Sequence, residues 1–460
     1  MDVITPTIFR AYDVRGTYPD QLNRNVAGTL ARAIGTYAKQ RGQSTVVTAR
    51  DGRLSGPDLQ DALNQGLIRA GIDVIDIGMV PTPVLYFAAL TLGMGSGVMV
   101  TGSHNPSDYN GFKIMIGGHT LYGEDITGLY DAIESDSLVI GEGSISEADA
   151  LTPYLKQITS DVRLKKPLKV AIDCGNGVAG VCAEALFKQL GCDVVPLYCE
   201  IDGTFPNHHP DPSKPKNLVD VITAVKTQNC HVGLAFDGDG DRVGVITEHG
   251  ELIFADRLMM LLSEDVLSRN AGATIIYDVK CSRHLGPVIQ RAGGEPLMWK
   301  TGHSLIKAKM KETGALLAGE MSGHIFFKER WLGFDDGLYT ATRLLEIFAK
   351  SDQPVSVLFD AIPDDVSTPE LNIEVPDTKK FAIVERVASI IQAEGLPLST
   401  IDGVRVDLES GWGLLRCSNT TPNLVLRFEA ESTEALEAIQ RTMLNALKKA
   451  EPTLELESLC

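Results

Sequence analysis

The sequence lacks any long uninterrupted hydrophobic run. No apolar stretch in its 460 residues approaches the about 18 residues at which a membrane-spanning helix is expected. The opening segment MDVITPTIFRAYDVRG has no basic start followed by an apolar stretch, so no secretory signal peptide is predicted. We therefore expect a cytoplasmic protein that has no membrane partner.

Dense runs of lysine and arginine are also absent. The chain has 42 Lys and Arg against 60 Asp and Glu, a formal net charge of −18. The electrostatic pattern of a nucleic-acid-binding protein is missing, so we expect no nucleic-acid partner. Because the overall field repels anions, a phosphate site must be built from locally gathered cations and backbone N–H groups.

The cysteines show no metal-ligand or redox spacing. None of the eight cysteines forms a C-x-x-C pair, and several lie in apolar runs, which predicts small buried hydrophobic residues. Glycine is abundant, with 44 copies that suit tight turns and close backbone approaches to ligands. The length and ordinary globular composition predict three or four domains of about 100–200 residues each.

Strand-like and helix-like segments alternate through most of the chain, the pattern of parallel sheets with crossover helices. The final ninety or so residues differ, because strand-like runs there lie between two long helical patterns. The fold class is α/β, with three mixed α/β domains of related topology at 1–150, 151–252 and 253–364, and a smaller α+β domain at 365–460. The clearest strand–helix pairs are 44–49 with 57–70, 168–174 with 178–190, and 273–280 with 283–292.

The segment DGDGDR is the sharpest local motif. Asp237, Asp239 and Asp241 recur at every second position between two strand-like runs. Two unit charges about 4 Å apart repel by about 4 kcal/mol at an effective dielectric constant near 20, so three converging carboxylates require a cation, and their hard oxygen ligands suit Mg²⁺ or Ca²⁺. An EF-hand is excluded, since Arg242 stands where that loop needs glycine and the flanks are strand-like. A polar surface turn is the alternative.

The segment TGSHNPSDYNGFK follows another strand-like run. Ser103 is presented on a loop rich in Gly, Asn and Pro at a strand end, where a nucleophile is well placed. His104 is its sequence neighbour, so the two side chains diverge and no Ser–His hydrolase dyad is implied. Lys113 can offset phosphate charge. The alternative is a hydroxyl-stabilised turn in a polar loop.

Three further loops carry polar side chains. KTGHS lies at a predicted helix start, which favours anions, and its histidine can act as a general acid or base. GEMSGH can hydrogen-bond sugar hydroxyls, and RCSNTTPN combines guanidinium, hydroxyl and amide donors suited to a phosphate clamp. Each alone also fits a structural role, as a helix-start histidine or a hairpin connection. The residues concerned are Lys300, Gly302 and His303; Glu320, Ser322 and His324; and Arg416, Ser418, Asn419 and Thr420, with Arg427 beyond.

One glycine motif indicates a different class of protein. Gly175, Gly177 and Gly180 have the G-x-G-x-x-G spacing of dinucleotide-binding folds, and Glu200 and Asp202 follow about 20 residues on, where a ribose-binding acid is expected. We favour a tight strand-to-helix turn that needs glycine for backbone reasons.

We call TGSHNPSDYNGFK the serine loop, DGDGDR the metal loop, GEMSGH the sugar loop and RCSNTTPN the phosphate loop. These loops, in this order, resemble those of the α-D-phosphohexomutase family, and the resemblance extends over essentially the whole chain. The GEMSGH wording is most similar to the bacterial bifunctional phosphomannomutase/phosphoglucomutase group. The resemblance implies four domains around a central polar cleft. It also implies a mutase that moves phosphate between the 1- and 6-positions of a hexose through phosphoserine and a hexose 1,6-bisphosphate. One Mg²⁺ per chain, glucose 1,6-bisphosphate as activator, a small phosphosugar substrate and a monomer are expected.

The resemblance also implies roles for individual residues. Ser103 matches the phosphoserine, and its phosphate joins the three aspartates as a magnesium ligand. FRAYDVRG matches the opening motif of the family and puts two residues near the reacting group. The general base is expected to be His303 or a group near Arg15. The catalytic set is Ser103, His303, Arg15, Lys113 and Arg242, and the substrate-binding set is Tyr12, His104, Asn105, Lys280, Lys300, Gly302, Glu320, Ser322, His324, Arg416, Ser418, Asn419, Thr420 and Arg427.

Three alternatives are left open. A phosphoglucosamine mutase would share the mechanism and differ in the sugar. A nicotinamide-dependent oxidoreductase would use the glycine turn. A non-catalytic phosphosugar-binding protein would keep the clamp, but the presence of Ser103 and of all three aspartates argues against it.

Overall fold

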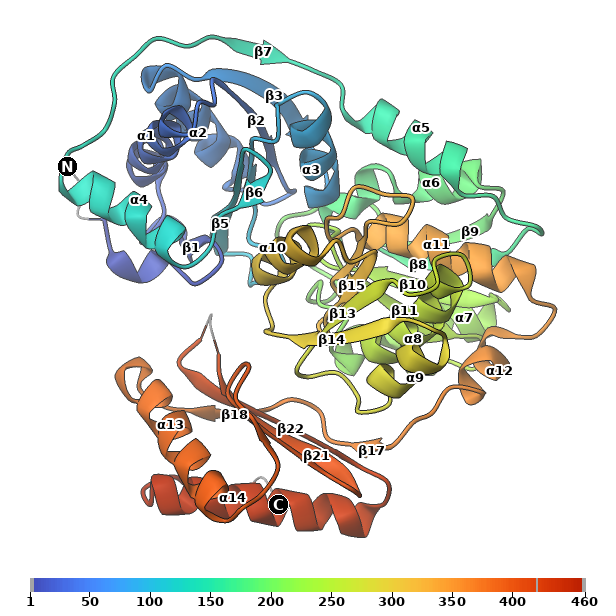
Figure 1. The fold of residues 1–460 in the computed structure, drawn as a ribbon. Coiled ribbons are helices and arrows are strands. Elements are labelled where there is room, and N and C mark those ends of the chain that lie inside the picture. Colours follow the sequence, from blue (N-terminus) through green and yellow to red (C-terminus); the bar gives the residue numbers. More distant parts are fainter. Residues whose placement is uncertain (1–3, 419–420, 457–460) are drawn as a thin grey trace.

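The computed structural model describes residues 4–418 and 421–456. These residues form four β-sheets, which define units I to IV in chain order (Figure 1). In Figure 1 the blue unit I lies above the red unit IV, and the green and yellow units II and III lie together beside them. None of the helices in the described ranges is both long and apolar enough to cross a bilayer.

Unit I is a mixed sheet with the strand order β1-β5-β4-β2-β3-β7, and β6 lies beside β5. α1 begins after Asn23, whose side chain accepts two backbone N–H groups left free at the helix start. The strands are β1 (Val14–Thr17), β2 (Thr45–Arg50), β3 (Asp73–Met79), β4 (Gly97–Val100), β5 (Tyr109–Ile116), β6 (His119–Thr120) and β7 (Ile145–Glu147); the helices are η1 (Pro6–Ile8), α1 (Arg24–Gln40), α2 (Gly56–Arg69), α3 (Thr82–Thr91) and α4 (Glu124–Glu134).

Unit II has the strand order β12-β11-β10-β8-β9. The helix expected over 178–190 is a 3-10 turn followed by a short α-helix, because the backbone of Cys182 between them has a φ of −140°, outside the helical region. The strands are β8 (Lys169–Asp173), β9 (Asp193–Leu197), β10 (Val232–Phe236), β11 (Val243–Thr247) and β12 (Leu252–Ile253); the helices are α5 (Leu151–Asp161), η2 (Val178–Val181), α6 (Ala183–Gln189), η3 (Pro215–Asn217) and α7 (Val219–Thr227).

Unit III has the strand order β14-β13-β15-β16, and unit IV is an antiparallel sheet backed by two helices. Unit III contains β13 (Thr274–Asp278), β14 (Glu295–Trp299), β15 (Leu317–Gly319), β16 (Ile325–Phe327), α8 (Ala255–Leu267), α9 (Leu285–Arg291), α10 (His303–Thr313), α11 (Gly337–Lys350) and α12 (Val355–Asp360). Unit IV contains β17 (Val366–Ser367), β18 (Leu371–Glu374), β19 (Leu398–Ser399), β20 (Val404–Leu408), β21 (Gly411–Cys417), β22 (Asn423–Ala430), α13 (Asp377–Ala393) and α14 (Thr433–Ala450).

The three α/β sheets differ from the parallel sheets that the alternation predicts. In each, a parallel strand is followed by an antiparallel one: β4 by β5, β10 by β11, and β15 by β16. The reason is loop length, since the connecting loops have only five to eight residues by the element bounds, and a parallel crossover needs about a dozen. The serine, metal and sugar loops are these three connections, and the phosphate loop joins β21 to β22.

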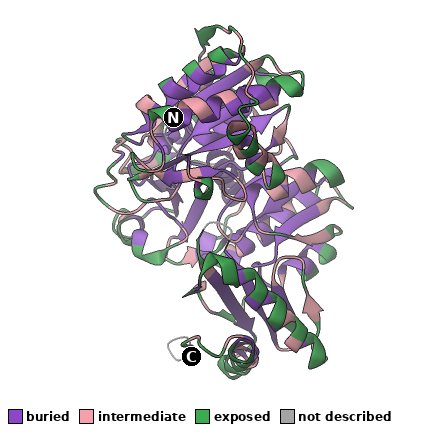
Figure 2. Cartoon of the chain, turned by 90° about the vertical axis from the view of Figure 1, so that its left-hand side faces the viewer, coloured by how far each residue is buried: buried purple, intermediate pink, exposed green. Residues whose placement is uncertain are grey.

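One continuous hydrophobic core runs through units I, II and III, whereas unit IV has its own. Figure 2 shows strands that are largely buried, with exposed residues on the outer faces of helices. Unit IV attaches to unit III through Trp412, which is fully buried and packs with Val279 and Leu414. The shared core fixes the loops of units I, II and III relative to one another, and the phosphate loop reaches them through a smaller contact.

Candidate active site

The serine loop holds Ser103 in a constrained conformation. Its φ is +48°, in the left-handed region, and only 1% of the residue is exposed. The Ser103 backbone N–H donates to Thr101 Oγ1 at 2.8 Å, and the Thr101 hydroxyl donates to Asp51 Oδ2 at 2.7 Å. A left-handed non-glycine residue costs about 1–3 kcal/mol and persists only where its surroundings fix it. The loop therefore presents the Ser103 hydroxyl in one direction.

Arg53 holds the backbone of the serine loop in this conformation. None of the sequence motifs indicated this residue. Its side chain is only 2% exposed and forms an ion pair with Asp51 at 3.3 Å. The ring of Phe205, from unit II, covers the guanidinium at 5.2 Å. The guanidinium donates to four backbone carbonyls of the serine loop, those of Ser103 (2.8 Å), Asn105 (2.7 Å), Pro106 and Tyr109 (2.9 Å).

The metal loop brings the three predicted aspartates together. Asp237, Asp239 and Asp241 are each fully buried, and a carboxylate oxygen from each lies within 4.8 Å of the others. Lys113 donates to Asp239 Oδ2 at 2.7 Å and to Asp241 Oδ2 at 2.5 Å. Oδ1 of Asp239 and Oδ1 of Asp241 have no hydrogen-bond partner. The three buried carboxylates face two cations, Lys113 and Arg242, which leaves negative charge and free oxygens, a donor set that suits a metal ion.

The electrostatics of the loop support the same conclusion. Burial, and then the two neighbouring carboxylates, raise the pKa of Asp237 well above its ordinary value. Burial alone would lower the pKa of Lys113, but Asp239 and Asp241 outweigh it and hold that pKa well above its ordinary value. Lys113 is therefore a fixed positive charge, and a divalent cation would remove the remaining repulsion among the carboxylates.

The serine and metal loops meet directly. The Ser103 hydroxyl donates to Asp237 Oδ2 at 3.2 Å, and its oxygen lies 3.2 Å from Nδ1 of His104. The expectation that these two neighbouring side chains diverge is therefore wrong, because the left-handed backbone at Ser103 turns its hydroxyl toward the His104 ring. Gly238 packs so closely that a Cβ there would overlap the carbonyl oxygen of Ser103. The predicted nucleophile is thus in contact with the predicted metal ligands, although 134 residues separate Ser103 from Asp237.

Arg242 connects this pair to unit III. Its Nε donates to Nε2 of His324 at 2.9 Å and lies 3.7 Å from Asp237 Oδ2. Because His324 Nε2 accepts that bond, we assign the ring proton to Nδ1, which faces Asp335 Oδ2 at 3.1 Å. One side chain, Arg242, therefore separates His324 from Asp237, the carboxylate that contacts the nucleophile.

His303 lies one layer further out. Its ring stacks on that of His324 with centroids 5.5 Å apart, and its Nδ1 contacts the Lys307 ammonium at 3.3 Å. Burial and Lys307 lower the pKa of His303 well below its ordinary value. Asp335 and Lys307, which no motif indicated, form a buried ion pair at 2.9 Å that supports both histidines.

The sugar loop packs against the start of α10. The Gly302 backbone N–H donates to Glu320 Oε1 at 3.2 Å, and the Ser322 hydroxyl donates to Glu320 Oε2 at 3.0 Å. The Tyr12 hydroxyl donates to the carbonyl of Thr301 at 2.7 Å. A Cβ on Gly302 would lie 2.6 Å from the Tyr12 ring, and its φ of +138° also requires glycine. Lys300 is exposed and forms no ion pair within the described residues.

The opening motif reaches the serine loop. Arg15 donates to Oδ1 of Asn105 and to the carboxylate of Asp13 through short hydrogen bonds. His104 is half-buried, and burial followed by Arg242 lowers the pKa of its ring. Arg15 therefore links the opening motif to Asn105 of the serine loop.

The cations of the phosphate loop are held by carboxylates. Arg416 donates to Asp402 Oδ2 at 3.0 Å, and Lys280 of unit III donates to Glu370 of unit IV at 2.7 Å. The Lys280 ammonium outweighs burial, which acts in the opposite direction, and lowers the pKa of Glu370 to about 2. The Ser418 hydroxyl accepts from Thr421, whereas the predicted Asn419 and Thr420 lie outside the described residues.

Arg427 lies beside one of these cations, Lys280. It is only 3% exposed and donates to the carbonyl of Lys280 at 2.5 Å. Its guanidinium lies 5.7 Å from the Trp412 ring centroid and 3.6 Å from Asp256. The side chain therefore positions Lys280 at the contact between units III and IV.

The glycine turn of unit II supports the metal loop. Gly175 has a φ of +52°, and a Cβ on Gly177 would lie 2.9 Å from the Gly238 carbonyl oxygen. The Val178 backbone N–H donates to that same carbonyl at 3.0 Å. Packing within the chain thus accounts for these glycines.

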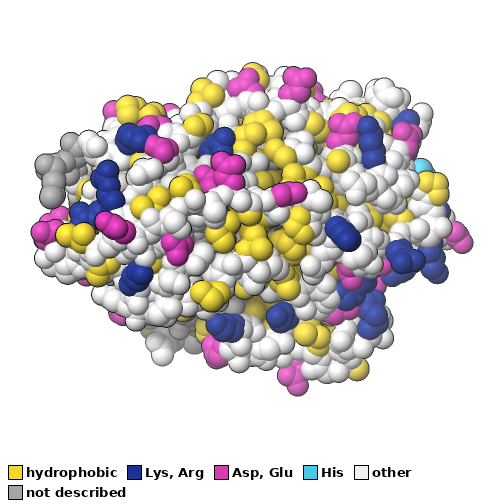
Figure 3. Space-filling model, turned by 90° about the horizontal axis from the view of Figure 1, so that it is seen from above, with side chains coloured by type: hydrophobic (Ala, Val, Ile, Leu, Met, Phe, Trp, Pro, Cys, Tyr) yellow, Lys and Arg dark blue, Asp and Glu magenta, His cyan; other side chains and the backbone are white. Residues whose placement is uncertain are grey.

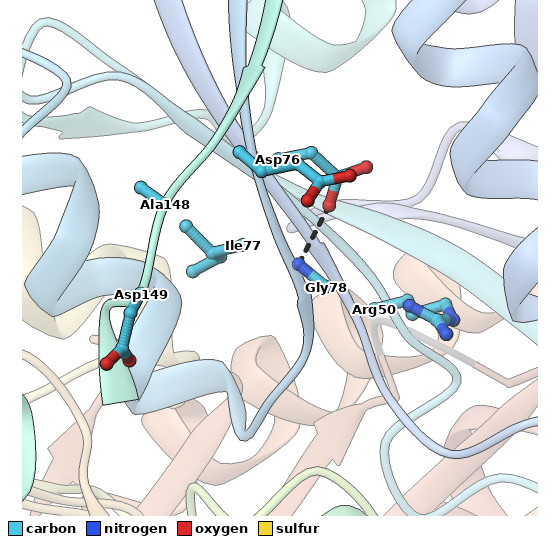
Figure 4. A pocket seen from close by; sticks show the side chains of 7 residues that line it. Arg50, Asp76, Ile77, Gly78, Ala148 and Asp149 are labelled. Atoms are coloured by element: carbon cyan, nitrogen blue, oxygen red, sulfur yellow. Dashed lines mark hydrogen bonds between the residues drawn. The ribbon is translucent and has the colours of Figure 1, made fainter. Parts of the chain in front are cut away.

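A separate pocket of about 570 Å³ lies in unit I and contains none of the predicted site residues. Figure 4 shows Asp76 at its wall accepting the backbone N–H of Gly78. Asp76 also accepts from Gln60 and Asn64, both at 2.8 Å, so its carboxylate is fully used in the fold. On the face shown in Figure 3, acidic and basic side chains are interspersed and form no continuous basic patch.

Comparisons with known proteins cover the whole of this architecture. Family profiles described as phosphoglucomutase/phosphomannomutase alpha/beta/alpha domains I, II and III match residues 6–139, 152–250 and 254–366. The profile of the C-terminal domain matches residues 370–446.

Individual relatives are similar over nearly their full length. A phosphomannomutase/phosphoglucomutase of Pseudomonas aeruginosa is 58% identical over 97% of this chain and 97% of its own. A phosphoglucomutase of Neisseria gonorrhoeae is 53% identical over 96% of each chain. A crystal structure of a phosphoglucomutase/phosphomannomutase family protein from Burkholderia thailandensis is 52% identical, with a TM-score of 0.94 over 98% of this chain and 99% of its own. The chain therefore belongs to the phosphoglucomutase/phosphomannomutase family, whose members are mutases of the isomerase class.

Proposed function

We propose that this hexose phosphate mutase interconverts the 1- and 6-phosphates of mannose and glucose through a phosphorylated Ser103. The observation that carries the proposal is the contact of the Ser103 hydroxyl with Asp237 at 3.2 Å, beside two further buried carboxylates. A serine so placed can carry a phosphoryl group whose charge is met by the same loop. Lys113 and Arg242 supply fixed positive charge around it.

The reaction proceeds by two phosphoryl transfers. The phosphorus–oxygen bond to Ser103 breaks as the free hydroxyl of a hexose monophosphate bonds to phosphorus, giving a hexose 1,6-bisphosphate. The intermediate turns end over end, and its other phosphate returns to Ser103. Catalysis of this kind depends mainly on positioning and on stabilising charge.

One Mg²⁺ would be held by Asp237, Asp239, Asp241 and an oxygen of phosphorylated Ser103. Oδ1 of Asp239 and Oδ1 of Asp241 have no hydrogen-bond partner and are available as ligands. A bound magnesium ion neutralises negative charge on the transferring group. Arg242 can turn from His324 to the phosphoryl oxygens, while Lys113 keeps the aspartates aligned.

A base must accept the proton of the attacking hydroxyl, and the contacts favour His324 over His303. His324 Nε2 is an acceptor linked through Arg242 to the nucleophile, and Asp335 faces its other nitrogen. The substrate hydroxyl would replace Arg242 as the donor to Nε2. His303 is further from Ser103 along the contacts, and the Lys307 ammonium lies against its Nδ1 at 3.3 Å.

The phosphate that does not react would be bound at the contact of units III and IV. Lys280 and Arg416 provide the cations there, and Glu370 and Asp402 hold them until phosphate takes their place. Glu320 and Ser322 form one hydrogen-bonded pair, which can recognise hydroxyls shared by glucose and mannose. The names of the Pseudomonas aeruginosa and Neisseria gonorrhoeae relatives support these two sugars.

A coupled assay with Mg²⁺ and a trace of glucose 1,6-bisphosphate, the expected activator, tests the proposal. We expect similar turnover of mannose and glucose 1-phosphates by the wild type, and its near-complete loss in Ser103→Ala and after chelation of the metal. Strong preference for glucosamine 1-phosphate would overturn the choice of sugar. Unchanged turnover in Ser103→Ala would overturn the mechanism.

A further inference from the structure

Two cysteines lie side by side at the edge of unit II that faces the site. Cys174 follows β8 directly, and Cys199 follows the neighbouring parallel strand β9. Their Sγ atoms are 3.6 Å apart, and both are free thiols. No second pair of thiols is in such contact within the part of the chain that the structure describes. The mutase mechanism uses neither of them.

We propose that Cys174 and Cys199 are a modification site, where a peroxide forms a reversible disulfide that lowers mutase activity. The effect on activity rests on the proposed function, whereas the disulfide itself does not. A disulfide requires the Sγ atoms to approach to about 2.05 Å, so the pair must close by about 1.5 Å from its separation of 3.6 Å. Rotation of the two side chains with a small backbone shift supplies this movement.

The half-buried thiol reacts first. The Cys199 thiolate attacks the O–O bond of hydrogen peroxide, becoming a sulfenic acid and releasing hydroxide. Cys174 Sγ then bonds to Cys199 Sγ and expels the sulfenic oxygen as water, which takes up the Cys174 proton. Two thiols are oxidised by two electrons, and one peroxide is reduced to two waters. Cys174 is fully buried, so it acts as the resolving thiol.

The pair supports both loops that carry the site. On one side, the Cys174 carbonyl accepts the backbone N–H of Gly177 at 2.7 Å, and Gly177 packs on Gly238 of the metal loop. Gly238 in turn touches the carbonyl of Ser103. Movement of Cys174 is therefore transmitted through two tight backbone contacts to the nucleophile and the aspartates.

On the other side, Cys199 begins the segment that covers Arg53. Gly203 packs against the Arg53 backbone, and the ring of Phe205 lies 5.2 Å from the guanidinium that holds the Ser103 carbonyl. Gly180 leaves no free space on its side of the Cys199 backbone, so the small shift that closes the disulfide must go to the segment that leads to Gly203 and Phe205. Interiors packed at this density transmit strain.

The test treats the full-length enzyme with hydrogen peroxide, alkylates the remaining thiols and maps peptides by mass spectrometry without reduction. We expect the wild type to lose two hydrogens, to yield a peptide joined through Cys174 and Cys199, and to lose about tenfold or more in kcat. Dithiothreitol should restore both the mass and the activity. Cys199→Ser should lose no activity, and Cys174→Ala serves as a second variant if that one does not fold.

Cys192→Ser is the matched control. Cys192 is buried in the same unit at the opposite end of β9, and its loss should leave the response to peroxide unchanged. The proposal is overturned if no joined peptide forms, if it forms with activity intact, or if Cys199→Ser is inactivated as strongly as the wild type. An enzyme with no mutase activity before oxidation would instead overturn the proposed function, and the joined peptide would still report on the cysteine pair.

Discussion

Replacing Arg53 by lysine tests how the nucleophile is held. Lysine keeps the positive charge, but its single ammonium cannot span the four carbonyls and the carboxylate that the planar guanidinium reaches. An ammonium has three N–H donors for these five acceptors, so at least two of them lose the donor that Arg53 provides. Ser103, whose φ of +48° depends on its surroundings, is then free to move.

The structure sets the size of both expected effects. Disrupting a buried ion pair costs about 3–5 kcal/mol, so the free energy of unfolding of Arg53→Lys should fall by an amount in that range. A shift of about 1 Å at a reacting atom costs on the order of 100-fold in rate. We therefore expect kcat to fall about 100-fold, with KM changed less than about twofold, because Arg53 is placed to touch the loop and not the sugar.

The assay is steady-state turnover of glucose 1-phosphate, measured beside thermal unfolding of the same samples. Arg24→Lys is the matched control, since Arg24 lies in the same unit but is 52% exposed and pairs with Asp58 and Asp61 on the surface. Exposed pairs are worth about 1 kcal/mol or less, so this variant should keep its stability and rate. If Arg53→Lys lost stability yet kept kcat within twofold of wild type, Arg53 would not position the nucleophile.

Two further changes test other contacts. Gly238→Ala places a Cβ on the Ser103 carbonyl oxygen and should lower kcat by about 100-fold. Gly128→Ala is the control, because Gly128 lies in the middle of α4 with open space around it. This variant should keep its kcat and stabilise the protein by about 0.5–1 kcal/mol. Equal activity of both variants in the coupled assay would contradict the packing argument. Glu370→Gln releases Lys280 from a partly exposed ion pair worth about 1 kcal/mol. Because the lysine is then free to bind phosphate, KM for hexose phosphate should fall by about fivefold. A rise in KM would mean that Glu370 positions Lys280 for the substrate.

The composition of the loops allowed the site to be predicted in outline from the sequence. The spacing of Asp237, Asp239 and Asp241 indicated converging carboxylates, and a serine on a polar loop at a strand end indicated a nucleophile. The structure brings these groups into contact, as a shared site requires. The antiparallel strand that follows each of these loops could also have been predicted, because loops this short cannot connect parallel neighbours.

The remaining parts depend on long-range contacts that no local pattern encodes. Arg53 lies in an ordinary DGR turn and acts on carbonyls about 50 residues away. Glu370 is 90 residues from the lysine that it holds. His303 was predicted as a general base because it lies at a helix start. The contacts of His324 with Arg242 and Asp335 could not be predicted, because they form only when units II and III pack together.

Direct detection of phosphate on Ser103 tests the central claim. Purified enzyme is incubated with glucose 1,6-bisphosphate, digested and mapped by mass spectrometry before and after addition of excess mannose 1-phosphate. We predict one phosphate per chain, located on Ser103, which passes to the sugar when substrate is added and is absent from Ser103→Ala. An enzyme that turns over mannose 1-phosphate at full rate while Ser103 carries no phosphate at any stage would contradict the account.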